Sequence, residues 1–180
     1  MAKSARNFTK LNLILSFLVC LIVAFSFSNA HAADHSSDDF RLTYDISGSL
    51  GNYGDRGYQE ISLGLNAHFA EWFVWRNAGF ARFTEGTDNI YGLDTTARFV
   101  LNLGDSKLGL VAFAGPGYRF ATSAGSSQAD SAPFAEAGVI AKLAGLSIGG
   151  GFKSVFNSLV RTGSPDDRQF FLILAGGGAL

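Results

Sequence analysis

The chain has 180 residues, of which 47% are hydrophobic and 16% charged; it is too apolar for a disordered protein and long enough for one domain. Fourteen Lys and Arg against fifteen Asp and Glu leave no basic surplus, which argues against nucleic acid as a partner. The 22 glycines and 13% aromatic residues favour strands and turns over helices, so we expect an all-β protein.

The first 32 residues have the pattern of a signal peptide. Three basic residues, Lys3, Arg6 and Lys10, precede an apolar stretch over residues 11–27, and the small-x-small sequence of residues 30–32 is typical of a cleavage site. A transmembrane anchor is the alternative, because this apolar stretch approaches the length that spans a bilayer. Cleavage would remove the single cysteine, Cys20, and with it any disulfide or thiolate chemistry. We expect an exported chain that begins with a short polar tail over residues 33–39.

From residue 40 onward, hydrophobic and polar residues alternate with a period of two, which predicts β-strands. The clearest segment is the first, where Leu42 and Tyr44 alternate with Thr43 and Asp45. The sixth segment is rich in alanine, so helix propensity alone would also allow a helix there. The pattern predicts eight strands, at about 40–50, 58–69, 72–83, 90–103, 107–120, 134–143, 146–156 and 168–180.

The predicted connections alternate in length. Those after the second, fourth and sixth strands are short, at residues 70–71, 104–106 and 144–145. Those after the first, third, fifth and seventh strands are longer, at 51–57, 84–89, 121–133 and 157–167. Barrels of the outer membrane have short periplasmic turns and longer external loops, and strands of about ten residues cross a bilayer. We therefore expect an all-β, eight-stranded antiparallel up-and-down transmembrane β-barrel.

If the apolar face of each strand meets lipid, the charged face must neutralise itself inside the barrel. The predicted lumen charge network comprises Arg41, Asp45, Glu60, Arg76, Arg82, Asp94, Arg98, Arg119, Glu136, Lys142 and Lys153. Aromatic residues near strand ends are predicted to form a girdle at the level of the lipid headgroups. This girdle comprises Trp72, Phe73, Trp75, Tyr118 and Phe120.

The export pattern, the eight alternating segments over residues 40–180 and the segment Gly115-Pro-Gly-Tyr-Arg-Phe120 resemble the small outer-membrane β-barrel proteins of the OmpA/OmpX type. The resemblance implies a monomeric barrel with a plugged polar interior in the outer membrane of a Gram-negative cell. It also implies contact with membrane lipid and lipopolysaccharide, and insertion by the barrel assembly machinery. Members of this group usually end on an aromatic residue, whereas this chain ends on Gly-Gly-Gly-Ala-Leu180.

Candidate catalytic and metal-binding residues are few. Enzymes that act on lipid occur among eight-stranded barrels, and hydrolysis by a serine needs a histidine and an orienting acid. His68 precedes the short link at 70–71, away from the outer rim where such deacylases act, and is expected to be an ordinary polar residue. The acidic pair Asp166-Asp167 with Asp55 and Glu85 is a candidate cation site, but clustered loop carboxylates are more often solvated. We expect no catalysis, no metal and no cofactor.

The function predicted from the sequence is an outer-membrane barrel that acts as an anchor or through its surface loops. Because an eight-stranded interior is filled by side chains, it forms at most a narrow channel. One alternative is a soluble periplasmic, lipocalin-like barrel that binds a small apolar ligand with its apolar face inside. A further alternative is a barrel enzyme acting on lipid.

Overall fold

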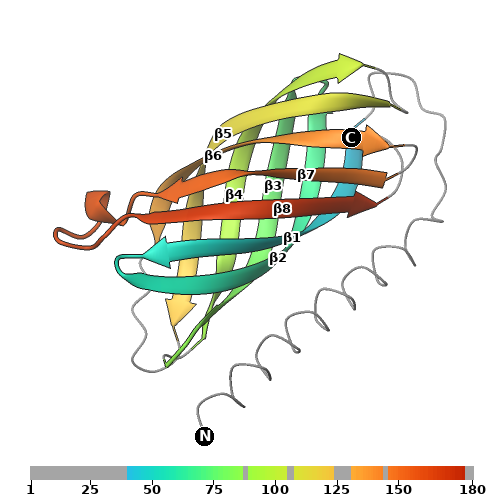
Figure 1. The fold of residues 1–180 in the computed structure, drawn as a ribbon. Coiled ribbons are helices and arrows are strands. Elements are labelled where there is room, and N and C mark those ends of the chain that lie inside the picture. The colour runs from blue at the N-terminus through green and yellow to red at the C-terminus, as the bar shows by residue number, and fades with distance from the viewer. Residues whose placement is uncertain (1–39, 87–88, 105–107, 124–130, 144–145, 177–180) are drawn as a thin grey trace, which may run out of the picture.

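The computed structural model describes residues 40–86, 89–104, 108–123, 131–143 and 146–176; the predicted signal peptide and polar tail lie outside them. Within these residues, eight strands form one closed antiparallel barrel, in which each strand pairs with its neighbours in sequence and β1 pairs with β8 (Figure 1). This architecture confirms the predicted fold class. The strands are β1 (Arg41–Tyr53), β2 (Arg56–Ala70), β3 (Phe73–Thr84), β4 (Ile90–Gly104), β5 (Leu108–Ser123), β6 (Ala132–Leu143), β7 (Leu146–Val155) and β8 (Asp167–Gly176).

The alanine-rich sixth segment is a strand, β6, paired with β5 on one side and β7 on the other. Ladder pairing on both sides therefore overrides the helix propensity of its alanines. A short 3-10 helix, η1 (Asn157–Leu159), lies in the connection between β7 and β8. Across the described ranges, no helix combines the length and the apolar character needed to cross a membrane.

The two ends of the barrel differ in their connections. At the end that we call the short-turn end, two or three residues separate β2 from β3, β4 from β5, and β6 from β7. At the opposite end, the loop end, β7 and β8 are joined by residues 156–166. The predicted loop at 51–57 is wrong, because β1 and β2 continue to Tyr53 and Arg56 and turn through Gly54 and Asp55. Gly54 has a φ of 58°, a left-handed conformation that glycine adopts without strain and that permits this tight hairpin.

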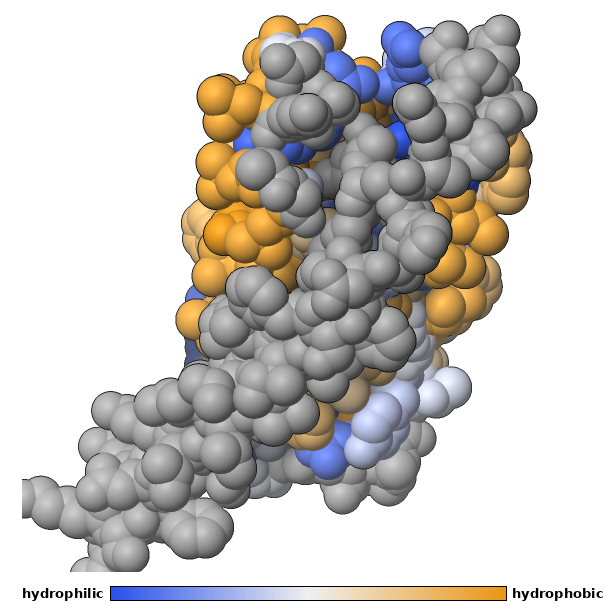
Figure 2. Space-filling view, turned by 90° about the vertical axis from the view of Figure 1, so that its right-hand side faces the viewer, coloured by the Kyte–Doolittle hydropathy of each residue, from blue (hydrophilic) through white to orange (hydrophobic). Residues whose placement is uncertain are grey.

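The outer wall of the barrel is apolar. Leu63 on β2, Leu101 on β4 and Leu172 on β8 are each about 60% exposed (61%, 60% and 62%). Figure 2 looks toward the short-turn end and shows hydrophobic residues along both flanks, with hydrophilic residues between them. A soluble barrel would bury these apolar rows, so the lipocalin-like alternative is wrong. An apolar wall on a closed sheet is the arrangement that a bilayer requires, because every strand's backbone groups are paired.

Glycines on the inner face make room for larger side chains. A Cβ added to Gly64 on β2 would lie 2.7 Å from Oδ2 of Asp45 and 2.8 Å from Nε of Arg76. A Cβ on Gly151 of β7 would lie 2.6 Å from Cζ of Phe171 and would also collide with the backbone of β6. These glycines therefore determine which large inward side chains the narrow lumen accommodates.

Candidate functional site in the barrel lumen

Ten charged side chains, five carboxylates and five cations, fill the middle of the lumen in the described part of the chain. None of them is more than 7% exposed, although every one carries an ionisable group. Equal numbers of opposite charges allow the cluster to neutralise itself without solvent. We call this cluster the lumen network; it consists of Asp45, Glu60, Arg76, Arg82, Asp94, Arg98, Arg119, Glu136, Lys153 and Asp167.

Arg119 on β5 is the hub of the lumen network. Its Nη2 lies 2.8 Å from Oε1 of Glu60 and 2.7 Å from Oδ2 of Asp94. Its Nε also donates to Oδ1 of Asp94 at 2.8 Å, so the guanidinium binds this carboxylate through two parallel hydrogen bonds. Each carboxylate has a second cation, because Arg82 contacts Glu60 at 3.1 Å and Lys153 contacts Asp94 at 2.8 Å.

Asp167, the first residue of β8, extends the lumen network toward the loop end. Its Oδ2 accepts a hydrogen bond from Nη2 of Arg82 at 2.6 Å, and its Oδ1 accepts one from the Tyr58 hydroxyl. Asp167 is fully buried, at 0% exposure. The sequence-based grouping of Asp167 with the loop carboxylates is therefore wrong. The strand begins earlier than its apolar pattern indicates, and the aspartate faces inward.

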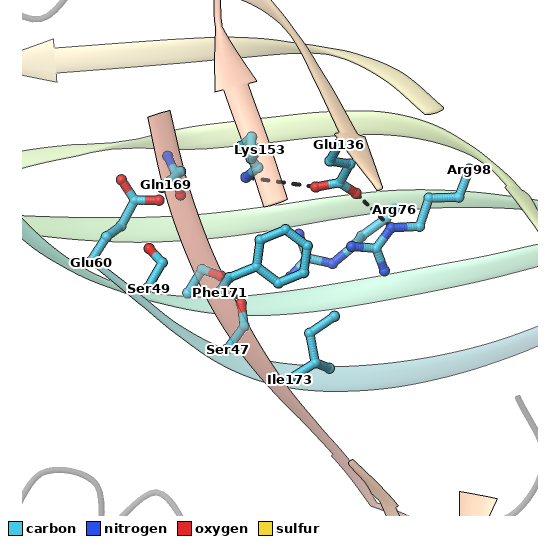
Figure 3. Close-up of a pocket in the computed structure, with 11 residues that line it drawn as sticks. Ser47, Ser49, Glu60, Arg76, Arg98, Glu136, Lys153, Gln169, Phe171 and Ile173 are labelled. Atoms are coloured by element: carbon cyan, nitrogen blue, oxygen red, sulfur yellow. Dashed lines mark hydrogen bonds and ion pairs between the residues drawn. The ribbon is translucent and has the colours of Figure 1, made fainter. Parts of the chain in front are cut away.

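A second part of the network lies on β1, β3, β4 and β6. Asp45 accepts two hydrogen bonds from Arg76, at 2.9 and 2.6 Å, and a third from Nδ2 of Asn66 at 2.8 Å. Arg98 contacts Glu136 at 2.6 Å. Lys153 lies 3.8 Å from Glu136 and so connects this part to Asp94 and the Arg119 hub. Figure 3 shows Lys153, Glu136 and Arg98 joined in this order across the lumen.

Four cations of the network each lie over an inward aromatic ring. The distances to the ring centroids are 3.7 Å for Arg82 over Tyr58, 4.4 Å for Arg98 over Phe113, 4.1 Å for Arg119 over Phe80 and 4.7 Å for Lys153 over Phe134. Such contacts stabilise a desolvated cation and fill the space beside the ion pairs. These four rings were not among the predicted site residues. The sequence does contain a signal for them, because residues two apart on a strand share a face. Phe80 lies two residues before Arg82, and Phe134 lies two residues before Glu136.

Little space remains in the lumen. A cavity of about 10 Å³, room for roughly one water molecule, lies among Ser47, Glu60, Arg98 and Gln169 (Figure 3). The amide Nε2 of Gln169 is buried there and has no hydrogen-bond partner among the described residues. A bound water would satisfy this donor. Nearby, an apolar cluster three to five residues from the short-turn ends of β5, β6 and β8 fills the barrel; it consists of Val111, Phe113, Ile140, Phe171 and Ile173.

Nine of the eleven residues predicted for the lumen network lie in it, and two lie elsewhere. Arg41 and Lys142 are at the short-turn ends of β1 and β6, and the ion pairs described above include neither. Arg41 is half-buried, and Lys142 donates to Oδ1 of Asn102 at 3.3 Å. The alternation pattern assigns both residues to the inner face, but it does not give their height along the barrel axis.

The predicted girdle residues lie at both ends of the barrel. Trp72 and Phe73 are at the short-turn end, where their rings contact Phe99 with centroids 6.2 and 6.0 Å apart. Trp75 lies two residues after Phe73 on β3, points outward and is 41% exposed. Tyr118 and Phe120 are near the loop end of β5, with ring centroids 4.9 Å apart.

The candidate cation ligands do not converge. Asp55 and Glu85 are exposed, and in the described segments no three His, Cys, Asp or Glu side chains form a group that could hold a metal ion. Asp166 instead accepts hydrogen bonds from the backbone N–H of Ser158 at 3.0 Å and from its hydroxyl at 2.7 Å. These bonds lower the pKa of the Asp166 carboxyl below its ordinary value.

No protein-family model and no curated protein matches this chain in sequence. Among solved structures, it is similar to the outer membrane enzyme PagL, with a TM-score of 0.56 and 15% identity over 74% of this chain and 99% of PagL. A de novo designed transmembrane β-barrel matches with a TM-score of 0.47 and 11% identity over 80% of this chain and 98% of the design. Ail, the attachment invasion locus protein of Yersinia pestis, solved with the heparin analogue sucrose octasulfate, matches with a TM-score of 0.40 and 12% identity over 79% and 99% of the two chains.

The likeness to PagL shows a shared fold, the eight-stranded transmembrane β-barrel. It supports this broader class and not the OmpA/OmpX type in particular. It also corrects the expectation that the chain catalyses nothing. That expectation rested on the small number of candidate catalytic residues and on the place of His68 away from the predicted outer rim, whereas the matching barrel is that of an outer membrane enzyme. The architecture is therefore no argument against catalysis.

Proposed function

We propose that the protein is an outer-membrane barrel, closed to free diffusion, that holds the connections of its loop end at the cell surface. The observation that carries this proposal is the combination of an apolar outer wall with a lumen whose five carboxylates and five cations are buried and paired. A diffusion pore needs a water-filled interior, whereas the cavity here has room for about one water molecule. The barrel is then an anchor, a monomer surrounded by lipid and lipopolysaccharide.

The difference between the two ends supports the proposed orientation. Outer-membrane barrels direct their longer connections outward and their short turns to the periplasm. The connection between β7 and β8 extends well beyond the strand ends in Figure 1. Two contacts brace it, from Nδ2 of Asn157 to the Pro165 carbonyl at 3.1 Å and from Ser158 to Asp166. Leu159 is 74% exposed in this connection, so an apolar side chain is presented to any surface partner.

Planar-bilayer recording tests the closed lumen. The full mature chain is expected to give no stepwise conductance, because paired charges and packed rings leave no aqueous path. A variant with both Glu60→Ala and Arg119→Ala removes the hub without changing the net charge, and is expected to conduct. Steps of conductance from the unmodified chain would contradict the proposal.

Trypsin treatment of intact cells tests the orientation. Arg161 is exposed in the β7–β8 connection, so cleavage there is expected without breaking the outer membrane. Arg161→Gln is the matched control and is expected to remain uncut at that position. Cleavage at Arg161 only after the outer membrane is permeabilised would place the loop end in the periplasm and refute the orientation.

A further inference from the structure

The outer wall of the barrel carries a single charged side chain in the described part of the chain. Along β8, Asp167 and Gln169 are buried toward the lumen, so Arg168 between them points outward, where it is exposed. Every other Asp, Glu, Lys or Arg of the eight described strands lies on the inner phase of its strand. Arg168 is the second residue of β8, and it therefore lies at the loop end of the apolar wall.

The guanidinium of Arg168 makes no hydrogen bond and no ion pair with any described residue. Asp166 acts on it electrostatically, but Oδ1 of Asp166 binds the backbone N–H and the hydroxyl of Ser158 instead, at 3.0 and 2.7 Å. A cation at the edge of a hydrocarbon layer is costly unless acceptor oxygens meet its N–H donors. The wall therefore presents these donors to a molecule in the surrounding lipid.

Polar side chains flank Arg168 on both neighbouring strands. Its ladder partners are Asn52 of β1 and Ser154 of β7, and partners directly opposite each other share a face of the sheet. β7, β8 and β1 lie side by side in Figure 1, so the three side chains form one row across the wall at the loop end. An amide, a guanidinium and a hydroxyl can donate together to one oxyanion. We call Asn52, Arg168 and Ser154 the polar row.

Next to the polar row, toward the short-turn end, the wall is apolar and uneven. Phe170 on β8 is 71% exposed, and its ring centroid lies 5.1 Å from that of Phe152 on β7. Leu172 follows on the same face, is 62% exposed, and has Gly48 as its partner on β1. A Cβ added to Gly48 would meet nothing within 4 Å, so there is open space beside Leu172. A charged row followed by open apolar space matches a lipid, whose headgroup is followed by a hydrocarbon chain.

We propose that the polar row binds the phosphate of an anionic lipid, and that one acyl chain of this lipid lies over Gly48 beside Leu172. The charges match, because one guanidinium faces a phosphodiester with a single negative charge. Arg168 fits two phosphate oxygens at once, while Asn52 and Ser154 are placed to donate to the others. The apolar surface next to the row commits the site to a lipid and not to free phosphate. The inference rests on the proposed function in one respect, namely that the wall faces lipid.

The test follows the amide signals of Asn52 and Ser154 by NMR in the full mature chain, folded in maltoside micelles, which contain no phosphate. Dioleoylphosphatidylglycerol is expected to shift these signals along a saturable curve. Dioleoylglycerol, which lacks the phosphate, and dioleoylphosphatidylcholine, whose ammonium balances it, are each expected to bind about tenfold more weakly or worse. Arg168→Gln is expected to weaken phosphatidylglycerol binding about tenfold, since it removes a charge-assisted contact. Arg56→Gln removes an exposed arginine from the inner phase of β2, and is the matched control with an unchanged curve.

A second variant, Gly48→Leu, tests the place of the acyl chain. Its side chain enters open space, so the barrel is expected to fold while phosphatidylglycerol binds about fourfold more weakly, as if about one CH₂ group had lost its contacts. Absence of saturation with phosphatidylglycerol overturns the proposal, as do equal binding by Arg168→Gln and the unmodified chain, or an equal shift with inorganic phosphate alone. Equal binding by Gly48→Leu contradicts the acyl-chain placement. Heat-modifiable migration on gels shows that each variant is folded. Flotation of the unmodified chain with phosphatidylcholine liposomes tests the lipid-facing wall separately, so a failed titration is distinguished from failure of the proposed function.

Discussion

Arg119 carries more ion pairs than any other cation in the lumen network, so Arg119→Met should destabilise the barrel strongly. The substitution retains an unbranched apolar stem over the Phe80 ring but removes the contacts with Glu60 and Asp94. Glu60 then keeps only Arg82 at 3.1 Å, and Asp94 keeps Lys153 at 2.8 Å. Five buried carboxylates face four cations, and one negative charge is left without compensation.

The expected loss is about 3–5 kcal/mol in the free energy of unfolding, the usual cost of removing one partner from a buried ion pair. The measurement is equilibrium unfolding in urea from phosphatidylcholine bilayers, followed by the fluorescence of Trp72 and Trp75 on the outer wall. Arg119→Lys keeps the charge but loses the two parallel hydrogen bonds to Asp94. Its free energy of unfolding should therefore lie between those of Arg119→Met and the unmodified chain. Arg168→Met, which removes an exposed arginine, is the control and should change stability by less than about 0.5 kcal/mol.

A free energy of unfolding for Arg119→Met within about 1 kcal/mol of that for Arg168→Met would contradict this prediction. That outcome would mean that water enters the lumen readily enough to solvate Glu60 and Asp94. The same variant would then be expected to conduct ions, so the bilayer recording provides an independent check.

The remaining predictions concern other parts of the barrel. Gly64→Ala places a Cβ within 2.8 Å of both Asp45 and Arg76, so it should separate this ion pair and cost about 1–3 kcal/mol in the same urea assay; Gly48→Ala, where the added Cβ meets nothing within 4 Å, is its control. Leu172→Arg on the outer wall should destabilise the barrel by about 2–4 kcal/mol if this position faces the middle of the bilayer, and a neutral effect would contradict the lipid-facing assignment. Because the pKa of Asp166 is lowered by its bonds to Ser158, its contact should persist above the ordinary carboxyl pKa and disappear as the pH falls through the lowered value. The amide signal of Ser158 during an acid titration reports this change. Asp166→Asn, which has no titratable carboxyl, is the control and should give a signal that does not change with pH, and a pH-independent signal in the unmodified chain would contradict the prediction.

Much of the fold could be predicted because the barrel imposes a period of two on each of the eight strands. Each strand faces lipid on one side and a narrow polar lumen on the other, so Leu63, Leu65 and Phe69 alternate with Ser62, Gly64 and Asn66 almost without interruption. The sixth strand was ambiguous because alanine is a good helix former, and only pairing with β5 and β7 decides its structure.

The features that could not be predicted depend on how far along the barrel axis a residue lies. Alternation assigns Arg41 and Arg119 to the same inner face, but strand tilt and stagger decide that one lies at a mouth and the other at the centre. Strand ends were also misjudged where polar residues continue a strand. Asn52 and Tyr53 extend β1 into a tight hairpin, and Asp167 begins β8 although it follows a loop-like acidic sequence. Inward rings such as Phe113 were missed because aromatic residues were assigned to lipid.

The pairing of β1 with β8 links the closure of the barrel to the electrical balance of its lumen. Asp167 and Gln169 reach the lumen only from the final strand, and Asp45 reaches it from the first. A chain whose first seven strands have formed still has an open seam, and its lumen holds five cations against four carboxylates, with Arg82 deprived of one partner. Water would have to solvate the unpaired charge in such an open barrel. Closing the seam expels the solvent and delivers the missing negative charge in the same movement.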